Sequence, residues 1–282
     1  MLYGGYVILM SRVKDIRLKV IPSNVANDFI KKNHYSGKVM QNSSLHFGAF
    51  LDDILHGVMS FGSPIDKRKV LNLVNTDNTN INSKWNEMLE LNRMAFDEVL
   101  PKYSESRCIS IATKLIKKNA PHIKWILSYA DATQSGDGTI YRASGFILTQ
   151  INENKSIVRM PNGDVICKIV LEPSFGGGAK GGVKKKQGKI GKYDGWTSNK
   201  YIKYVGGEFL KGFQLRYIYF LHPEERKNLT VPEIPFSKIK EMGVSMYLGK
   251  KKCDVGVKRS TASFQDVGGG AIPTTSLHLK YA

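Results

Sequence analysis

The feature that most constrains this fold is an apolar run that leads through a polar turn into an amphipathic helix. Residues 102–107 form the turn, and apolar side chains follow it at helical spacing from Cys108 to Ile116. The pattern before the turn is compatible with a helix or a strand. We interpret Met88–Phe96 as a strand, because a strand–turn–helix unit then forms. Its first helical turn, with unpaired N–H groups and a positive dipole end, predicts a phosphate site.

Polar side chains around this turn supply the expected cofactor-binding residues. Ser104 is the expected N-cap, and simple capping of the helix is the alternative to a ligand-binding role. Ser106 and Arg107 flank the same turn. Arg93 and Asn92 lie on the preceding strand beside the expected cofactor, and strand alternation places them on opposite faces. We therefore predict that Ser104, Ser106, Arg107, Arg93 and Asn92 bind the cofactor.

The charge of the chain predicts an anionic partner. Its 282 residues carry a formal net charge of +18, and residues 151–260 hold 22 Lys plus Arg against 10 Asp plus Glu. Such a surface attracts polyanions through counterion release, so nucleic acid is the expected partner. A membrane is disfavoured, because the lysines stand among glycines rather than on an amphipathic helix. No apolar run approaches the roughly 18 residues that a membrane-spanning helix needs.

The cysteines and the first residues indicate an intracellular protein. Cys108, Cys167 and Cys253 are odd in number and widely spaced, which argues against a disulfide framework or a Cys-based zinc site. Residues 2–10 lack a basic region before them and a small-residue cleavage site after them. They therefore make a poor signal peptide.

The order of the expected elements divides the chain into five parts. Strands are expected at 16–21, 45–50, 54–61, 125–130, 146–150 and 215–221, and helices at 23–30 and 139–144. The polar, Asn-rich residues 62–84 suggest a surface loop or a substrate lid. The five parts are a leader at 1–15, a core at 16–151, a basic insertion at 152–212 with a hairpin and a Gly/Lys-rich loop, the last core strand and C-terminal elements at 213–252, and a tail at 253–282 that we expect to be disordered.

Candidate catalytic residues follow the first helix and a buried strand. Asp131 directly follows the apolar run 125–130, at the edge of the sheet where open α/β folds place ligands, and it can accept a proton. Its alternative role is to cap the next helix. His34 suits a general base near neutral pH, or a charged helix end. His34, Tyr35 and Asp131 together also form a candidate metal site, although no pair of them has a diagnostic spacing.

A run of lysines in the insertion indicates contact with nucleic-acid backbone. Aromatic residues follow it closely, which favours phosphate contact over a merely solvated run. The predicted DNA-binding residues are Lys184, Lys185, Lys186, Lys189 and Lys192, and Tyr193, Trp196, Tyr201 and Tyr204 follow them.

The order of elements resembles the acyl-CoA-dependent N-acyltransferase (GNAT) fold. This implies an α/β protein whose central mixed sheet is flanked by helices, here with a large basic insertion before the last strand. In that family the turn after the fourth strand binds the CoA pyrophosphate, usually through Arg/Gln-x-x-Gly-x-Gly/Ala. Ser104–Ser110 stands at that place without the glycines. Tyr141 lies where the family often places a tyrosine that protonates the CoA thiolate; a packed helix tyrosine is the alternative.

Seven strings, in the same order, are similar to the Mom family of phage DNA-modification proteins. The resemblance covers roughly residues 15–250. The strings are Asn33–Gly37, Leu45–Gly48, Glu90–Met94, Ser104–Arg107, Tyr129–Ala132, Gly138–Phe146 and Gly212–Phe220.

This resemblance implies an enzyme that converts adenine N6 in duplex DNA to a carbamoylmethyl derivative and so protects phage DNA from restriction. It implies double-stranded DNA and a small-molecule group donor as partners, and the host-cell cytoplasm as location. The donor is expected to be acetyl-CoA or a related acyl donor, with an iron or other metal ion as a possible second cofactor. The base must leave the stack, and Tyr35, Phe47 and Tyr129 can stack on it unless they are core.

Two rival functions remain open at this point. An acyl-CoA-dependent N-acetyltransferase could act on RNA or protein, and the mass of the product distinguishes it from the adenine-modifying enzyme. A basic DNA-binding or packaging protein without catalysis would tolerate alanine at Asp131 or His34 but not substitutions at Lys184–Lys186.

Overall fold

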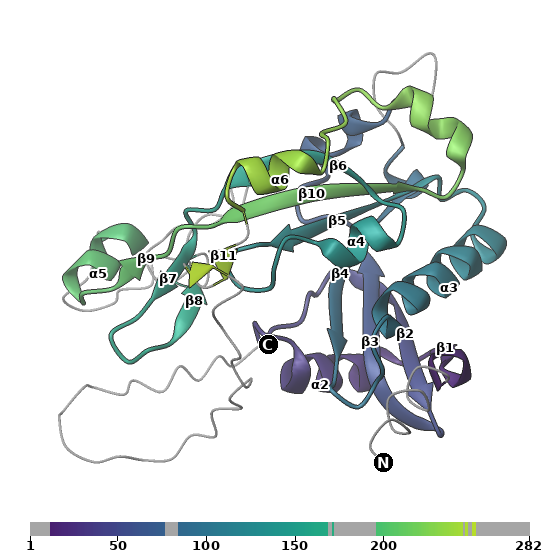
Figure 1. Cartoon of the computed structure of the whole chain (residues 1–282), viewed down its shortest axis with the longest axis horizontal. Coiled ribbons are helices and arrows are strands. Elements are labelled where there is room, and N and C mark those ends of the chain that lie inside the picture. The colour runs from purple at the N-terminus through teal and green to yellow at the C-terminus, as the bar shows by residue number, and fades with distance from the viewer. Residues whose placement is uncertain are drawn as a thin grey trace, which may run out of the picture.

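A seven-stranded mixed sheet forms the centre of the protein (Figure 1). The computed structural model describes residues 12–76, 84–168, 171, 196–244, 246–247 and 250–251. The strand order is β1-β2-β3-β4-β5-β10-β6, and all neighbours are antiparallel except β4 and β5. The strands are β1 (Arg17–Val20), β2 (Ser43–Leu51), β3 (Ile54–Gly62), β4 (Met88–Phe96), β5 (Trp125–Asp131), β6 (Ile147–Glu153) and β10 (Phe213–Phe220).

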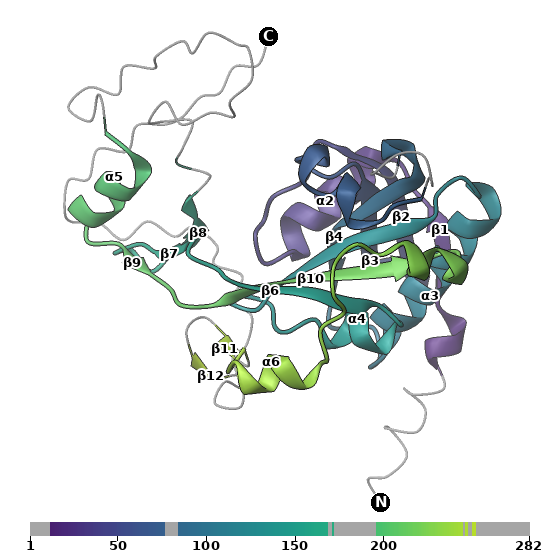
Figure 2. The ribbon, with the colours of Figure 1, turned by 90° about the horizontal axis from the view of Figure 1, so that it is seen from above.

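Helices cover both faces of this sheet (Figures 1 and 2). Val58 and Met59 are neighbours on β3, so they point to opposite faces. Val58 packs in a cluster with Ile30 of α2, whereas Met59 packs in a cluster with Ile109 of α3. The second cluster also contains Tyr141 of α4, so α4 covers the same face as α3. The helices on the core are α2 (Ser23–Asn33), α3 (Ser104–Asn119), α4 (Thr139–Ala143) and α6 (Ser237–Glu241).

The observed order of elements confirms the predicted GNAT-like α/β architecture. A strand and a helix precede a hairpin, and β4 then leads through the turn into α3, β5, α4 and β6. The hairpin turns at Asp52 and Asp53, both of which have positive φ angles of 51° and 59°. Gly145, with φ of 83°, follows α4 as expected for a helix end. The C-terminal strand β10 lies between β5 and β6.

The predicted surface loop at residues 62–84 is in part a piece of the core. Short 3-10 helices η2 (Lys67–Lys69) and η3 (Leu71–Leu73) lie in it. Val70, Leu73 and Val74 are buried in a cluster with Trp125 of β5. These apolar residues have the spacing of one helix face, and the polar residues around them hid that pattern. Residues 77–83 lie outside the described structure.

The insertion forms an arm that extends from the core sheet (Figure 2). The predicted hairpin of the insertion turns at residues 161–164, and a third strand pairs with it to give the order β8-β7-β9. The predicted DNA-binding residues 184–192 and the tail at 253–282 lie outside the described residues. Within the part of the chain that is described, no helix is long and apolar enough to cross a membrane. The arm contains β7 (Ile157–Arg159), β8 (Val165–Cys167), α5 (Ser198–Tyr204) and β9 (Glu208–Phe209), and β11 (Met246–Tyr247) pairs with β12 (Lys250–Lys251) further on.

Two glycines of the β2–β3 hairpin give a matched test of this fold. A Cβ at Gly62 would lie 2.0 Å from the backbone oxygen of Asn42, which cannot move without shifting the chain. A Cβ at Gly48 would meet the ends of the Leu55 and Phe50 side chains, at 2.8 and 2.9 Å. We expect Gly62→Ala to cost about 1–3 kcal/mol of unfolding free energy in urea, and Gly48→Ala to cost less. Equal costs would contradict the close approach at Gly62.

Candidate active site

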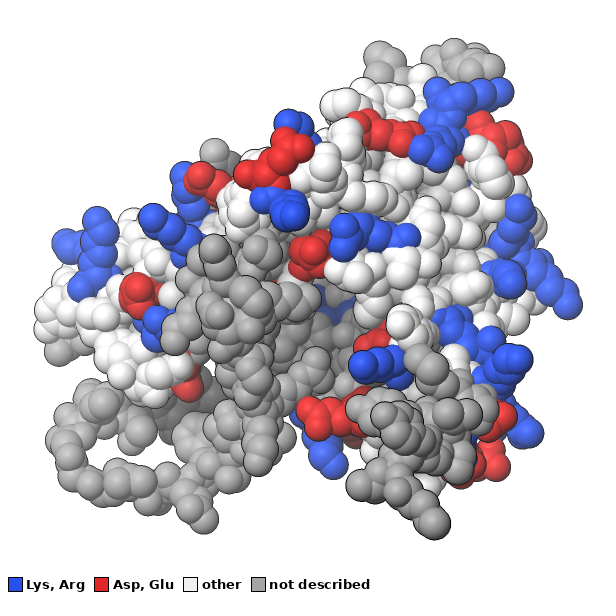
Figure 3. Space-filling view, in the orientation of Figure 1, with Lys and Arg blue, Asp and Glu red and all other residues white. Residues whose placement is uncertain are grey.

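A pocket of about 880 Å³ opens where β4 and β5 separate. The two strands pair only through Met88–Glu90 and Trp125–Leu127, although β4 continues to Phe96 and β5 to Asp131. The pocket is lined by the end of α2, the second half of β4, the start of α3 and the loop between β5 and α4. Figure 3 shows this face hollowed at its centre, where these elements meet. The divergence of one strand pair thus creates the site.

The start of α3 offers backbone N–H groups to this pocket. Tyr103 precedes the helix with a left-handed φ of 72°. Among the described residues, the N–H groups of Glu105 and Ser106 have no acceptor, and both residues line the pocket beside Lys102. These two N–H groups and the Lys102 ammonium group suit one phosphate of a ligand.

The side chains predicted to help at this turn have other contacts. Ser104 is not the N-cap: it is buried inside the first turn, and its hydroxyl donates to the Pro101 carbonyl at 2.5 Å. The Ser106 hydroxyl donates to the Tyr103 carbonyl at 3.1 Å. Arg107 does not line the pocket, and its guanidinium group donates to the Lys14 carbonyl at 3.4 Å. Phosphate binding here would therefore depend on backbone groups.

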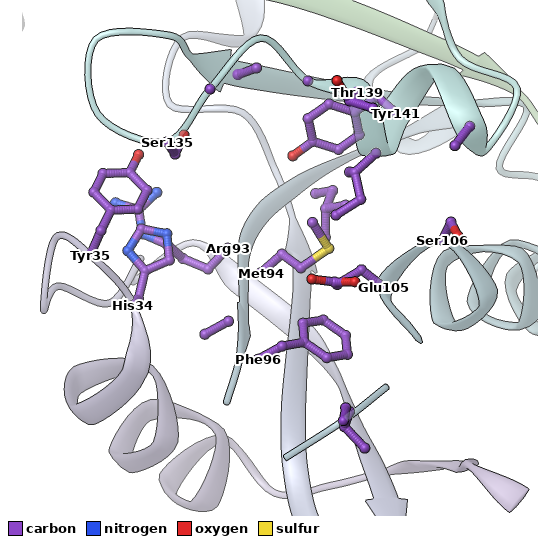
Figure 4. Close-up of a pocket in the computed structure, with 18 of the residues that line it drawn as sticks. His34, Tyr35, Arg93, Met94, Phe96, Glu105, Ser106, Ser135, Thr139 and Tyr141 are labelled. Atoms are coloured by element: carbon purple, nitrogen blue, oxygen red, sulfur yellow. The ribbon is translucent and has the colours of Figure 1, made fainter. Parts of the chain in front are cut away.

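Glu105 is a pocket residue that the sequence reasoning missed. Figure 4 shows its side chain reaching towards Met94 and Phe96 in the middle of the site. Its carboxylate repels a second phosphate next to the first. The site therefore fits a single phosphate at α3 better than a pyrophosphate. In the sequence, the signal that could have identified Glu105 was its position in the first turn of the expected helix.

Asn92 and Arg93 both line the pocket, against the prediction from strand alternation. The register between β3 and β4 shifts between the Ser60–Arg93 and Phe61–Leu91 pairs, so β4 bulges at Asn92. The Arg93 guanidinium group donates to the backbone carbonyls of Lys38 and Asn92, at 3.0 and 2.8 Å. Burial lowers the pKa of Arg93. A bulge thus brings two polar side chains of one strand to the same site.

His34 and Tyr35 form an aromatic pair at the end of α2. Their ring centroids lie 4.2 Å apart, and Tyr35 is 51% exposed. Figure 4 shows them beside Arg93, with the Tyr35 hydroxyl facing Ser135. The ring surface is half exposed, but the hydroxyl end faces Ser135 and is desolvated there, and this desolvation together with the charge of Asp131 raises the pKa of Tyr35 to about 12. The phenol therefore keeps its proton at neutral pH.

The tautomer of His34 follows from its contact with Ser36. The backbone N–H of Ser36 donates to His34 Nδ1 at 3.1 Å, and the Ser36 hydroxyl lies 2.8 Å from the same nitrogen. Because a backbone N–H can only donate, the proton of the neutral ring is assigned to Nε2. In this tautomer Nε2 carries the proton and Nδ1 is the basic nitrogen, so a general-base role for His34 would require the contact of Nδ1 with Ser36 to break.

Asp131 lies outside the lining of the pocket and organises the turn that follows β5. Its Oδ1 accepts from the Thr133 N–H and the Asn154 amide, both at 3.0 Å, and its Oδ2 accepts from the Gln134 amide at 2.9 Å. Within the described chain, no group of three His, Cys, Asp or Glu side chains is arranged to hold a metal ion. The Asp131 oxygens and His34 Nδ1, which belong to the predicted metal set, already accept hydrogen bonds from protein donors.

Tyr141 lines the pocket from α4, whereas Phe47 does not line it. The Tyr141 ring is buried, 5.3 Å from Phe146 and 5.2 Å from Tyr217. Burial raises the pKa of Tyr141, so its phenol keeps a proton to donate at neutral pH. Phe47 is 3% exposed and packs edge-on against Phe61, which makes it a core residue. Tyr129 lines the pocket from β5.

Comparisons with known proteins agree with the sequence resemblance. The model of the Mom protein family matches residues 15–238. A protein of Escherichia phage Mu named methylcarbamoylase mom is 30% identical over 222 residues, which cover 77% of this chain and 80% of that protein.

Similar solved structures include acetyltransferases from two bacteria. One, from Bacillus subtilis, is in complex with CoA; it has 11% identity, a TM-score of 0.38, and coverage of 73% of this chain and 98% of that chain. A spermidine/spermine N-acetyltransferase from Vibrio cholerae, in complex with manganese ions, has 8% identity, a TM-score of 0.40, and coverage of 77% and 98%.

The contacts of Asp131 predict a loss of stability on substitution. Asp131→Asn replaces an accepting oxygen with an amide group that faces a donor, so we expect it to cost about 1–3 kcal/mol in a urea titration. Asp53→Asn, at an exposed turn residue with positive φ, is the matched control and should change stability by less than about 0.5 kcal/mol. Unchanged stability in Asp131→Asn would show that the carboxylate is not needed for the turn.

Proposed function

Because this chain belongs to the Mom protein family, we propose that it transfers a carbamoylmethyl group to N6 of adenine in duplex DNA. The observation that carries the proposal is a pocket built from two different walls. One wall has the helix N–H groups of α3, and the other has the aromatic pair of α2. A transfer between two molecules needs two such adjoining subsites. The modified DNA would resist restriction in the cytoplasm of the host.

The wall at α3 is the proposed donor subsite. The N–H groups of Glu105 and Ser106, with Lys102, would hold one phosphate of a small-molecule donor such as acetyl-CoA or a related acyl donor. Asn92 and Arg93 line the pocket from β4 beside it. Because N6 is bonded to a methylene carbon in the product, the donor must present an electrophilic methylene carbon. Acetyl-CoA is electrophilic at its carbonyl carbon, so it would need conversion before the transfer. A carbamoylmethyl group also contains an amide nitrogen that an acetyl group lacks, so the donor or a second substrate must bring it.

The wall at α2 is the proposed base subsite. Adenine N6 is stacked in duplex DNA, so the base must be extruded to react. The exposed Tyr35 ring, packed on His34, offers a flat surface for stacking. Arg93 lies beside this pair (Figure 4).

Tyr141 is the proposed proton donor to the leaving group. It lines the pocket from α4, and Figure 4 shows its hydroxyl facing the open space above Met94. Because burial raises its pKa, the phenol is protonated at neutral pH and can give its proton to a developing negative charge.

The arm is the proposed contact with the DNA backbone. Lys200 and Lys203 on α5 are exposed, and Lys200 Nζ lies 4.8 Å from the centre of the Trp196 ring. Tyr204 is 61% exposed. Figure 3 shows Lys and Arg side chains along the outer end of the arm. Phosphate contacts of this kind position a protein on duplex DNA without reading its sequence. Lys184, Lys185, Lys186, Lys189 and Lys192 precede α5 in the chain and would extend this contact.

Mass spectrometry of nucleosides tests the reaction and the base subsite together. Plasmid DNA from cells that express this chain should contain deoxyadenosine heavier by one carbamoylmethyl group. We expect Tyr35→Ala to reduce this product about 10- to 100-fold, because base stacking is lost. Tyr35→Phe is the matched control and should retain most of the product. An equal loss in both variants would assign the role to the hydroxyl instead of the ring.

Unmodified DNA from soluble wild-type protein would overturn the proposed function. An acetylated RNA or protein would then favour the acetyltransferase alternative. DNA binding without any modified product would favour the non-catalytic one.

Charge reversal on the arm tests the proposed DNA contact. Lys200→Glu with Lys203→Glu should weaken duplex binding and lower the slope of log affinity against log salt by about 2, because two phosphate contacts are lost. Lys117→Glu with Lys118→Glu makes the same charge change at exposed residues in the last turn of α3. An equal loss of slope in this control would show that only net charge matters. Fluorescence anisotropy of labelled duplex DNA at several salt concentrations provides the measurement.

A further inference from the structure

Glu90 lies at the point where β4 and β5 separate. It is paired with Leu127, in the last residue pair of the parallel ladder. Met88, two residues earlier on β4, is buried in a cluster with Trp125 and Leu127, against which Tyr129 packs. Because residues two apart share a strand face, Glu90 is on the Tyr129 side of the sheet, opposite α3.

Four residues of the pocket wall interact electrostatically with the Glu90 carboxyl. Asn92 and Arg93 interact with it from β4, and the phenols of Tyr129 and Tyr141 are influenced by its charge from β5 and α4. All four of these residues line the pocket, whereas Glu90 does not. Glu90 therefore shares a sheet face with Tyr129 on the neighbouring strand, and Tyr129 belongs to the pocket wall.

Among the described residues, no salt bridge is formed by the Glu90 carboxyl. The Arg93 guanidinium group is hydrogen-bonded to backbone carbonyls, and burial outweighs its effect on Glu90 together with that of Asn92. Burial raises the pKa of Glu90 to about 7. A carboxyl of this kind can both take up and release a proton near neutral pH.

Most other carboxylates near the pocket have polar partners, and Glu98 is exposed to solvent. Asp131 accepts three hydrogen bonds, and the Asp97 carboxylate is 2.8 Å from His56 Nδ1. Asp137 accepts from Thr139 and lies 3.7 Å from the Arg142 guanidinium group. Glu105 stands on the positive end of the α3 dipole.

We propose that Glu90 is the proton acceptor of the transfer and that it is reached from the pocket through the Tyr129 phenol. This inference rests on the proposed function. As adenine N6 bonds to the donor carbon, its N–H proton passes to the Tyr129 oxygen, while Tyr129 gives its own proton to the Glu90 carboxylate. The N–H electron pair stays on N6. The leaving group of the electrophilic carbamoylmethyl donor departs with the pair that bound it to carbon.

Tyr129 fits this role by its position and its chemistry. It is on the same side of the sheet as Glu90, whereas Tyr141 packs on the α3 side. Burial and the charge of Glu90 raise the pKa of Tyr129, so a free phenolate does not form at neutral pH. Tyr129 can therefore relay a proton only if it accepts one from adenine N6 while it donates its own to Glu90. Glu90 does not line the pocket, so it acts on the substrate only through Tyr129.

The pH profile of DNA modification tests this role. The wild-type rate should rise with pH through about 7 as Glu90 ionises, and then level off. Glu90→Gln should lower the rate about 100-fold and remove this rise, and Glu90→Asp should restore part of both. Tyr129→Phe should show the same loss as Glu90→Gln. Glu233→Gln is the control, because Arg226 holds the pKa of Glu233 low and its loss should leave the profile unchanged.

The outcomes separate this inference from the proposed function. Wild-type protein that makes no modified deoxyadenosine would overturn the proposed function. A Glu90→Gln variant that makes the product with the wild-type pH profile would overturn the role of Glu90 and leave the function standing.

A stability measurement gives a second readout that needs no activity. The folded pKa of Glu90 is raised above its unfolded value, so the folded state binds more protons between those two values and loses stability as pH rises through this window. Glu90→Gln carries no such charge. From about pH 5 to about pH 8, the urea midpoint of the wild type should therefore fall relative to that of Glu90→Gln. Parallel midpoints would show that Glu90 does not titrate in this range.

Discussion

The site depends on the short parallel ladder between β4 and β5. Only three residue pairs join these strands, and both strands continue past the last pair. Parallel strands need a crossover, and here α3 provides it on one face of the sheet. Beyond Glu90, the edge of β4 that faces β5 has no strand partner in the described structure, so its backbone groups border the pocket instead of a neighbouring strand. The same divergence that interrupts the sheet therefore gives a ligand access to its interior.

Polar groups in this opening are stabilised by local contacts more than by salt bridges. Arg93 donates to two backbone carbonyls, and Arg216 of β10, which is 9% exposed, donates to Thr149 of β6. Burial lowers the pKa of both guanidinium groups and raises that of Glu90. Buried charges without opposite partners are costly, and folds keep them mainly at functional sites. The opening in the sheet concentrates such groups around one cavity.

In the proposed function, the core provides the reaction pocket and the arm provides the contact with DNA. The core sheet positions the pocket, and its seven strands hold the pocket walls rigidly on one frame. The arm is inserted between β6 and β10, the two strands at one end of the sheet, so it can carry basic residues without disturbing β4 or β5. The insertion approaches the pocket frame closely at Gly212, where a Cβ would lie 1.9 Å from the Thr133 hydroxyl in the turn that Asp131 organises. DNA contact and chemistry would therefore meet at the end of β5.

The sequence alone determined the order of elements, because local patterns carry that information. The turns at Asp52–Asp53, residues 161–164 and Gly145, and the helix after residues 102–107, follow from short-range preferences that need no distant partner. His34, Tyr35, Arg93 and Tyr141, which were singled out from the sequence, line one pocket in the structure, and their roles stay predictions.

Only the tertiary structure decided what surrounds each polar side chain. The bulge at Asn92 arises from pairing with β3, and one partner of Asp131 is Asn154, which lies 23 residues away in sequence. The burial of Val70 depends on packing with β5. In the sequence Glu90 is an ordinary polar strand residue, and only the pairing of β4 with β5 brings Tyr129 to the same face of the sheet. Acidity and hydrogen bonding depend on neighbours that the chain brings together only when it folds, and a linear pattern does not contain them.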